Sequence, residues 1–402
     1  MRRPALSERA GTRVEGSERV RRAEGVTLLL LALLTVAPAQ PPSPLTPVRE
    51  VADGISLFHL TDPALVDPEA PVSAWLLRLD PARVTLRAAL ANDEVMGTET
   101  VADTAARHGA IAAINAGFFL PNGDPSGLYK KSGRLISDTR RPRGAIGISS
   151  ANGRVRLLFD RLTATMSLII HRSLGRKTVV PIDGIDTTRL RGRLMLFTPA
   201  YHEHTDTASG GLEWPVAGRP WRVMAEPTET GRTPIPPDGF VLSFGGRSLP
   251  GSLRGLKRGS RVDLETSYVP LSSEDDEWAA AGDIIGGAGL LAQGGRYIED
   301  WTVERFGPGF AETRHPRTMI GVAEDGSIWL AAVDGRQPAL SAGMTLAELQ
   351  GLARKLRLRD SLNLDGGGST TMWVKGEIVN SPSDAAGPRK VSDALLVFPL
   401  TH

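Results

Sequence analysis

The sequence contains no cysteine among its 402 residues. This absence excludes disulfides, a thiolate nucleophile and thiolate metal ligands together. A membrane-spanning apolar run is missing as well. The apolar stretch Val26–Val36 is only eleven residues long, whereas a transmembrane helix needs about 20. We therefore expect no permanent membrane anchor.

The sequence also lacks an excess of basic residues once its first 39 residues are set aside. The whole chain has 47 Lys and Arg against 45 Asp and Glu, and residues 1–39 hold seven Arg and four Glu, so the remainder carries 40 basic and 41 acidic residues. Binding to a nucleic-acid duplex needs basic residues that neutralise phosphates. The charge balance therefore argues against nucleic acid as a partner.

The first 39 residues have the order of a secretory signal. Arginines at 19, 21 and 22 precede the apolar run, and Ala37-Pro38-Ala39 follows it as a small-x-small cleavage site. We predict a signal peptide over 1–39, with export to the periplasm or the extracellular space. A Pro-rich linker over 40–50 and a folded domain over 51–402 follow.

The composition indicates many turns, with 44 Gly, 29 Pro and 41% hydrophobic residues. These values favour an α+β fold, with a β-rich mixed sheet and a few packed helices. Residues 154–277 read as a looser, variable region of short strands between Gly and Pro turns. No internal repeat is visible.

The most informative stretch is NLDGGGST, from Asn363 to Thr370. Three glycines in succession let the backbone approach a ligand closely or adopt positive φ. Apolar, β-prone segments lie on both sides, so Asp365 is predicted at the end of a strand. The lysine and the following helix of a P-loop are missing, as is the pattern of a dinucleotide fingerprint.

A second carboxylate is predicted at a neighbouring strand end. The runs Thr318–Ala323 and Ser327–Val333 read as a hairpin that ends at Asp334-Gly335-Arg336. Thr345-Leu346-Ala347-Glu348 then forms a capping box that opens a helix. If the strands before and after this helix are parallel, Asp334 and Asp365 lie at the same sheet edge.

An ordered set of motifs carries a resemblance to a known family. The motifs are Asn115-Ala116-Gly117-Phe118-Phe119, Arg317-Thr318-Met319-Ile320-Gly321, Asp334-Gly335, Asn363 to Ser369, Pro382-Ser383-Asp384 and Pro388-Arg389-Lys390-Val391-Ser392. Together they resemble the phosphodiester glycosidase family over about Thr85 to Phe398, most densely over 314–398. Ala116 departs from the pattern, since the family usually has glycine there.

The resemblance implies hydrolysis of a sugar whose anomeric carbon is esterified to phosphate. A phosphodiester oxygen leaves readily, so a carboxylate that activates water or stabilises an oxocarbenium ion matters more than a strong acid. The predicted catalytic carboxylates are Asp365 and Asp334. The predicted substrate-binding residues are Arg317 and Arg389 as clamps, Asn115 and Asn363 as sugar contacts, Gly117, and the N–H groups of Gly366, Gly367, Gly368 and Ser369.

Several alternatives stay open at this point. Asp365 could belong to a plain turn, and Arg317 or Arg389 to surface ion pairs. Phe118 and Phe119 are predicted to pack in the core and loops in preference to forming a platform for substrate. No metal or cofactor is predicted, although a divalent cation at Asp365 or Asp334 would leave little sequence trace. His202 and His204 lack a third ligand at a suitable spacing.

Two rival functions are also compatible with the sequence. One is a non-catalytic cell-surface module that binds an anionic polysaccharide, and the other is a phosphodiesterase that cleaves P–O instead of C–O. The predicted partner is a sugar phosphodiester or an anionic glycan.

Overall fold

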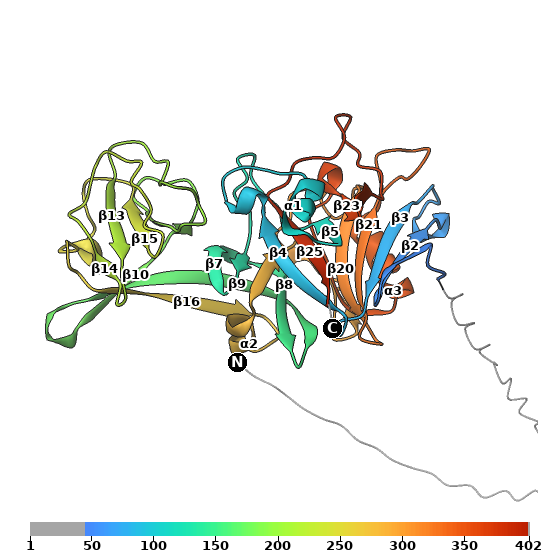
Figure 1. Cartoon of the computed structure of the whole chain (residues 1–402), viewed down its shortest axis with the longest axis horizontal. Coiled ribbons are helices and arrows are strands. Elements are labelled where there is room, and N and C mark those ends of the chain that lie inside the picture. The colour runs from blue at the N-terminus through green and yellow to red at the C-terminus, as the bar shows by residue number, and fades with distance from the viewer. Residues whose placement is uncertain (1–44, 401–402) are drawn as a thin grey trace, which may run out of the picture. The chain divides into compact units, whose positions relative to one another are not determined.

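Antiparallel strands are the main regular elements of the computed structural model, which describes residues 45–400. These residues fall within one compact unit. The predicted signal peptide, 1–39, and the start of the predicted linker lie outside the described residues. The strand-rich architecture, with three α-helices among the described residues, agrees with the β-rich α+β fold predicted above (Figure 1).

The largest sheet has eight strands in the order β1-β2-β3-β21-β20-β22-β18-β19. Its strands are β1 (Arg49–Ala52), β2 (Ile55–Leu60), β3 (Ala74–Leu79), β18 (Leu290–Gln293), β19 (Arg296–Tyr297), β20 (Arg317–Ala323), β21 (Ile328–Val333) and β22 (Leu358–Asn363). The predicted hairpin is confirmed as β20 and β21. Both β21 and β22 run antiparallel to β20, so they are parallel to each other. Their carboxyl ends therefore lie at one edge, beside the start of β20.

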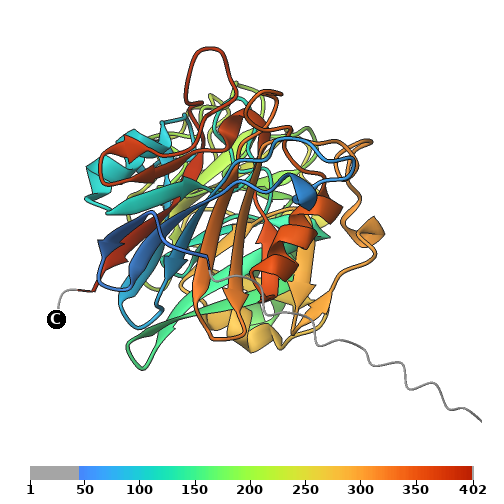
Figure 2. The same cartoon turned by 90° about the vertical axis from the view of Figure 1, so that its right-hand side faces the viewer.

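Helix α3 (Leu346–Lys355) connects β21 to β22. The predicted capping box is confirmed, because Thr345 accepts the N–H of Glu348 while the Glu348 side chain accepts the N–H of Thr345. The helix packs its apolar side, which includes Leu346, Leu349 and Leu352, against one face of the large sheet (Figure 2). This crossover places the end of β22, and the residues that follow it, at the same sheet edge as the end of β21.

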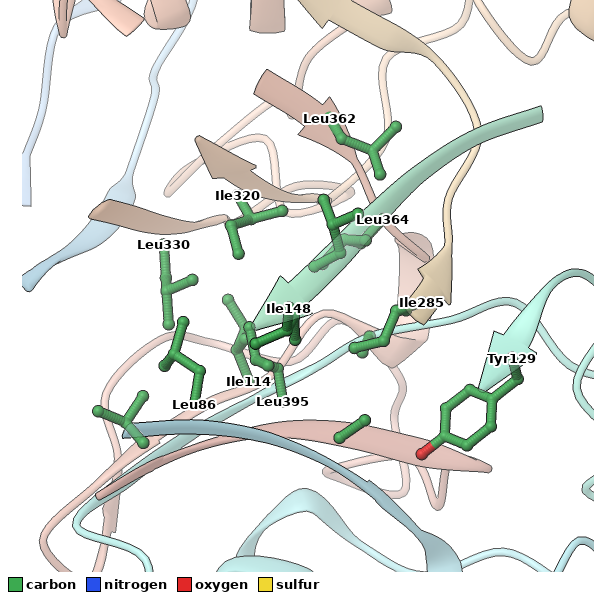
Figure 3. Packing of buried hydrophobic residues seen from close by; sticks show 14 of the residues in the cluster. Leu86, Ile114, Tyr129, Ile148, Ile285, Ile320, Leu330, Leu362, Leu364 and Leu395 are labelled. Carbon is green, nitrogen blue, oxygen red and sulfur yellow. The ribbon is translucent and has the colours of Figure 1, made fainter. Parts of the chain in front are cut away.

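A five-stranded sheet packs against the other face of the large sheet. Its order is β24-β23-β5-β25-β4, with β4 (Val84–Leu90), β5 (Ala112–Asn115), β23 (Met372–Val374), β24 (Glu377–Ile378) and β25 (Asp393–Pro399). Figure 3 shows Ile320, Leu330 and Leu364 facing residues of this second sheet across the core. Helix α1 (Val101–His108) covers the outer side of the second sheet.

The remaining sheets lie largely within the stretch predicted as variable. One contains β6 (Tyr129–Lys131), β7 (Arg134–Ser137), β8 (Thr139–Ala151), β9 (Arg154–His171), β10 (Lys177–Pro181), β16 (Val262–Pro270) and β17 (Asp283–Gly286). The other contains β11 (Gly184–Ile185), β12 (Leu194–Phe197), β13 (Leu212–Ala217), β14 (Arg222–Val223) and β15 (Phe240–Phe244). Helix α2 (Asp275–Ala280) follows β16.

The prediction of short strands throughout 154–277 is wrong for β9. This strand has 18 residues and pairs with β8, β10 and β16. Its buried and half-buried residues alternate over most of its length, as expected for a strand with one covered face. The alternation from Leu162 onward was the sequence signal for a long strand.

Candidate functional site

Asp365 lies just beyond the end of β22, where the first and second sheets meet. Its backbone N–H donates to the carbonyl of Ala116 at 2.9 Å, and its carbonyl accepts Nδ2 of Asn115 at 2.7 Å. The segment after β5 and the loop after β22 are thus tied together. Asp365 as a residue is half-buried, so its carboxyl group lies in a largely protein environment.

The surroundings of Asp365 shift its acidity. Burial, the largest effect, raises its pKa to about 6, and the negative charge of Asp393 acts in the same direction. The hydroxyl of Ser369, the N–H of Gly366 and the charge of Arg389 oppose this rise. A carboxyl with such a pKa exchanges its proton close to neutral pH, which suits proton transfer in catalysis.

Asp393, the first residue of β25, provides a second carboxylate next to Asp365. It is buried, Oδ1 accepts the N–H of Gly117 at 2.6 Å, and Oδ2 accepts the Ser392 hydroxyl at 2.5 Å. Burial raises its pKa to about 6 as well. Gly117 leaves little room for a side chain, since a Cβ there would lie 3.1 Å from Asp393 Oδ2. The predicted binding residue Gly117 therefore holds a carboxylate.

Sequence reasoning missed Asp393, although the motif that it used ends at Ser392. The available signal was an acid that directly precedes the apolar run Ala394–Val397. A carboxylate at the start of a buried strand needs a reason to be there. Here that reason is its pairing with Gly117 beside Asp365.

The glycine loop makes fewer N–H groups available than predicted. Gly366 donates to the carboxylate of Asp365, Gly367 donates to the carbonyl of Pro316, and Ser369 donates to the carbonyl of Gly366. Among the described residues, only the N–H of Gly368 in this predicted set makes no such bond. The loop therefore offers a single N–H group, and its main contribution is to let charged side chains approach.

Two arginines lie against this loop. A Cβ at Gly368 would collide with Asp384 and Arg389, and a Cβ at Gly367 would lie 3.0 Å from Nη2 of Arg336. Arg389 forms a two-point ion pair with Asp384, at 2.8 and 3.1 Å. Arg336 contacts Nδ1 of His315 at 3.2 Å and has no carboxylate partner among residues 45–400. Arg336 was noted at the strand end but was not predicted as a binding residue.

Asp334 has a different environment from Asp365. It is buried, and its oxygens accept the Ser73 hydroxyl at 2.8 Å, the N–H of Ser381 at 2.7 Å and Nδ2 of Asn380 at 3.1 Å. Burial raises its pKa, while these hydrogen bonds lower it. Because the protein already occupies both oxygens, the geometry favours a structural role for Asp334 over the predicted catalytic one.

Arg317, predicted as a clamp, is also turned toward the protein. Nε donates to the carbonyl of Met344, and Nη2 donates to the carbonyls of Phe310 and Thr313. Burial lowers its pKa to about 10, with a further effect from Arg336. Its guanidinium holds the segment before β20 in place, so a direct substrate contact would have to come from Nη1.

The two predicted sugar contacts are buried as well. Both ends of the Asn115 amide are used, because Oδ1 accepts the Thr318 hydroxyl and the N–H of Thr371 while Nδ2 holds Asp365. Asn363 donates through Nδ2 to the carbonyl of Ala288, and its Oδ1 is buried without a partner. Both asparagines support the loop instead of facing a ligand.

No metal centre is apparent in the described part of the chain. No group of three or more His, Cys, Asp or Glu residues converges there in a way that could hold a metal ion. His202, which the sequence marked together with His204, contacts Glu94 through Nδ1 at 3.1 Å. Over residues 45–400, no helix has the length and apolarity needed to cross a membrane.

The family comparison bears on this site directly. Residues 211–398 match the model of the phosphodiester glycosidase family. The predicted resemblance to that family is confirmed. The match includes Asp334, Asp365, Arg389 and Asp393, and it also covers the second half of the stretch predicted as variable. Asn115 and Gly117 lie outside the matched range.

Two solved structures are similar to this phosphodiester glycosidase-like chain. A hypothetical protein from Synechocystis has a TM-score of 0.72 and 25% identity, covering 87% of this chain and 63% of that one. A candidate exported protein from Burkholderia pseudomallei has a TM-score of 0.69 and 26% identity, covering 82% of this chain and 74% of that one. Both share the fold described above.

Two curated relatives also match, one over a short segment and one at low identity. A prophage-derived protein of Bacillus subtilis is 36% identical over 84 residues, which are 21% of this chain and 13% of that protein. A protein of Rickettsia conorii is 23% identical over 264 residues, which are 64% of this chain and 86% of that protein. The chain therefore spans only a small part of the Bacillus relative and less than two thirds of the Synechocystis structure.

Proposed function

We propose that this protein is an exported glycosidase that hydrolyses the glycosidic bond of a sugar-1-phosphodiester. The observation that carries the proposal is the position of Asp365. It is a half-buried residue with a pKa of about 6, it lies beside the buried acid Asp393, and the adjoining loop brings in Arg336 and Arg389. The family match supports the reaction class.

In this proposal, Asp365 stabilises the charge on the sugar and accepts a proton from the attacking water. As the bond between the anomeric carbon and the phosphate oxygen breaks, the phosphate takes the electron pair, and the ionised carboxylate stabilises the positive charge that develops on the sugar. A water oxygen bonds to the anomeric carbon, and Asp365 accepts its proton. No strong acid is required, because a phosphate monoester is a good leaving group.

The two arginines would bind the phosphate. A guanidinium can form two parallel hydrogen bonds to a phosphate, which fixes its orientation as well as its charge. Arg336 has no carboxylate partner among the described residues, whereas Arg389 would exchange the Asp384 carboxylate for the phosphate. The Gly368 N–H is available to the same oxygen atoms.

Isotopic water tests the reaction directly. The protein is incubated with N-acetylglucosamine-1-phosphodiesters and related sugar phosphodiesters in ¹⁸O-water. We expect the label in the released sugar, because C–O cleavage adds the water oxygen to the anomeric carbon. Label in the phosphate would instead identify a P–O-cleaving phosphodiesterase. Absence of turnover across the panel would favour the binding module.

Export is part of the proposal and has its own test. The predicted signal peptide precedes the described residues, and a structure of similar fold is that of a candidate exported protein. We expect mature protein to begin at or near Gln40 and to be recovered outside the cytoplasm. N-terminal sequencing that finds residues 1–39 on cytoplasmic protein would contradict export.

A further inference from the structure

A separate cleft next to the proposed site has an unusual lining. It has a volume of about 230 Å³, and Phe118, Phe306 and Phe310 line it together with Arg143. All four side chains are half-buried. Gly127, Gly286, Gly287 and Ala288 add backbone to its walls. The cleft therefore combines aromatic surface, backbone walls and one positive charge.

The three rings form one continuous group. The Phe306 and Phe310 centroids are 4.7 Å apart, and the Phe118 and Phe310 centroids are 6.0 Å apart. Aromatic faces of this kind bind the apolar C–H face of a ring-shaped ligand. Phe118, for which packing was predicted in preference to a substrate platform, lies at the wall of the cleft.

Arg143 carries a charge that has no hydrogen-bond or ion-pair partner within residues 45–400. Among the described residues its guanidinium forms no hydrogen bond and no ion pair, and it lies 5.5 Å from the centroid of Phe306. Burial lowers its pKa, and the nearby Glu304 opposes this effect. The Glu304 oxygens already accept the N–H groups of Gly144, Gly289 and Leu290 and Nε of Arg161. A half-buried, unpaired guanidinium favours an anionic ligand.

The cleft adjoins the proposed catalytic carboxylates through the backbone. Phe118 directly follows Gly117, which donates to Asp393. Ala288 exchanges two hydrogen bonds with Asn363, two residues before Asp365. Phe310 lies under Arg317, whose guanidinium is 5.3 Å from its centroid. A ligand in the cleft is thus bounded by the same segments that position Asp365 and Asp393.

We propose that this cleft is a substrate subsite for a sugar ring that carries an anionic group. The ring lies on the phenylalanines, and its carboxylate or phosphate pairs with Arg143. The volume suits one ring better than a chain of several. The inference deepens the proposed function, on which its link to catalysis rests, by naming an acidic sugar as the substrate class.

Binding measurements test the subsite without relying on turnover. Methyl α-D-glucuronide, methyl α-D-glucoside and glucose 6-phosphate are titrated into the protein by calorimetry. We expect at least one of the two anionic sugars to bind about 10-fold more tightly than the neutral glucoside. The more tightly bound one identifies the substituent as carboxylate or phosphate. Equal binding of all three, or binding of none, would overturn the proposal.

Matched variants assign the preference to the cleft. Arg143→Gln should abolish the preference, whereas Arg141→Gln, which removes the same charge from an exposed residue two positions away, should keep it. Phe306→Leu should weaken the acidic and neutral sugars by similar factors. Retention of the preference in Arg143→Gln, or unchanged affinities in Phe306→Leu, would contradict the subsite.

The outcomes separate this inference from the proposed function. Selective binding of an anionic sugar by a protein that hydrolyses no sugar phosphodiester would keep the subsite and reject the enzyme. Turnover of sugar phosphodiesters with no preference for an anionic ring would do the reverse. If Arg143→Gln does not fold, Phe306→Leu and the loss of the wild-type preference at high salt still decide the matter.

Discussion

The loops after β21 and β22 each contain an aspartate, but the two carboxylates have different surroundings. Each places an aspartate followed by glycine at the same sheet edge, on either side of β20. Asp334 is buried and bound by three side-chain or backbone donors, whereas Asp365 is half-buried beside Asp393 and two arginines. A carboxylate whose hydrogen-bonding capacity is taken up by the protein fixes structure. A carboxylate with fewer protein donors is available for chemistry, and the pKa of about 6 at Asp365 places its proton exchange near neutral pH.

We expect the largest effect on activity from Asp365→Asn. The amide keeps the shape of the side chain and removes its charge, so we expect the turnover of a sugar phosphodiester to fall by roughly 10²-fold or more, which is about 3 kcal/mol. Thermal unfolding should stay close to that of the wild type. A variant that keeps more than about a tenth of the activity would show that Asp365 is a turn residue.

Asp393→Asn should remove a pH dependence of stability. The folded pKa of Asp393 is about 6, against the ordinary aspartate value of 3.8 in the unfolded chain, so between these pH values the folded state retains a proton that the unfolded state has released. The contribution of Asp393 is fully present below pH 3.8 and is lost as the pH rises through 6, by on the order of 3 kcal/mol. Urea unfolding of wild type and variant at pH 4 and pH 7 measures this difference.

The same variant tests the coupling to Asp365. Without the charge of Asp393, the pKa of Asp365 should fall, and the acid limb of the activity profile should move to lower pH. A difference in stability between variant and wild type that is the same at both pH values would contradict a raised pKa for Asp393. If the acid limb of the activity profile does not move, the charge of Asp393 does not raise the pKa of Asp365.

Asp334→Ala should act on stability first. It leaves the N–H of Ser381 and Nδ2 of Asn380 buried with fewer acceptors, which we expect to cost about 1–3 kcal/mol. Asp334→Asn keeps an acceptor and should hold its turnover within about tenfold of the wild type. Chemical denaturation and steady-state kinetics measure the two effects. A folded Asp334→Asn protein without activity would restore Asp334 as a catalytic residue.

The smallest effects are expected at the arginines. Arg336→Gln should raise KM for a sugar phosphodiester about 10-fold with less change in kcat, because a phosphate contact is lost in ground state and transition state alike. Arg389→Gln should have a weaker effect, since Asp384 competes for its guanidinium. Lys390→Gln is the matched control at an exposed neighbour. Kinetics in which all three variants behave alike would reject the proposed phosphate contacts.

Local patterns predicted much of the fold near the site. The hairpin of β20 and β21, the capping box at Thr345 and the strand before Asp365 each depend on short-range residue order, and each is present. The parallel relation of β21 and β22, which the sequence analysis took only as a condition, is what the structure has. The 18-residue strand β9 was not predicted, because Gly and Pro in the surrounding sequence obscured its alternation.

The site itself was predictable in location but not in the exposure of its side chains. Sequence places Asp334 and Asp365 at strand ends, yet it does not show that Ser73, Asn380 and Ser381 close over one and not the other. Those donors come from segments up to 261 positions away. The pairing of Gly117 with Asp393, 276 positions apart, is hidden for the same reason.

Titration of Asp365 by NMR tests the central claim most directly. Protein labelled with ¹³C at aspartate carboxyls is titrated with acid, and Asp365→Asn assigns the resonance. We predict a midpoint near pH 6 for Asp365, and a change in that midpoint when a sugar phosphodiester is bound. A midpoint at the ordinary value of 3.8 that does not respond to the sugar phosphodiester would contradict the assignment of Asp365 as the functional carboxylate.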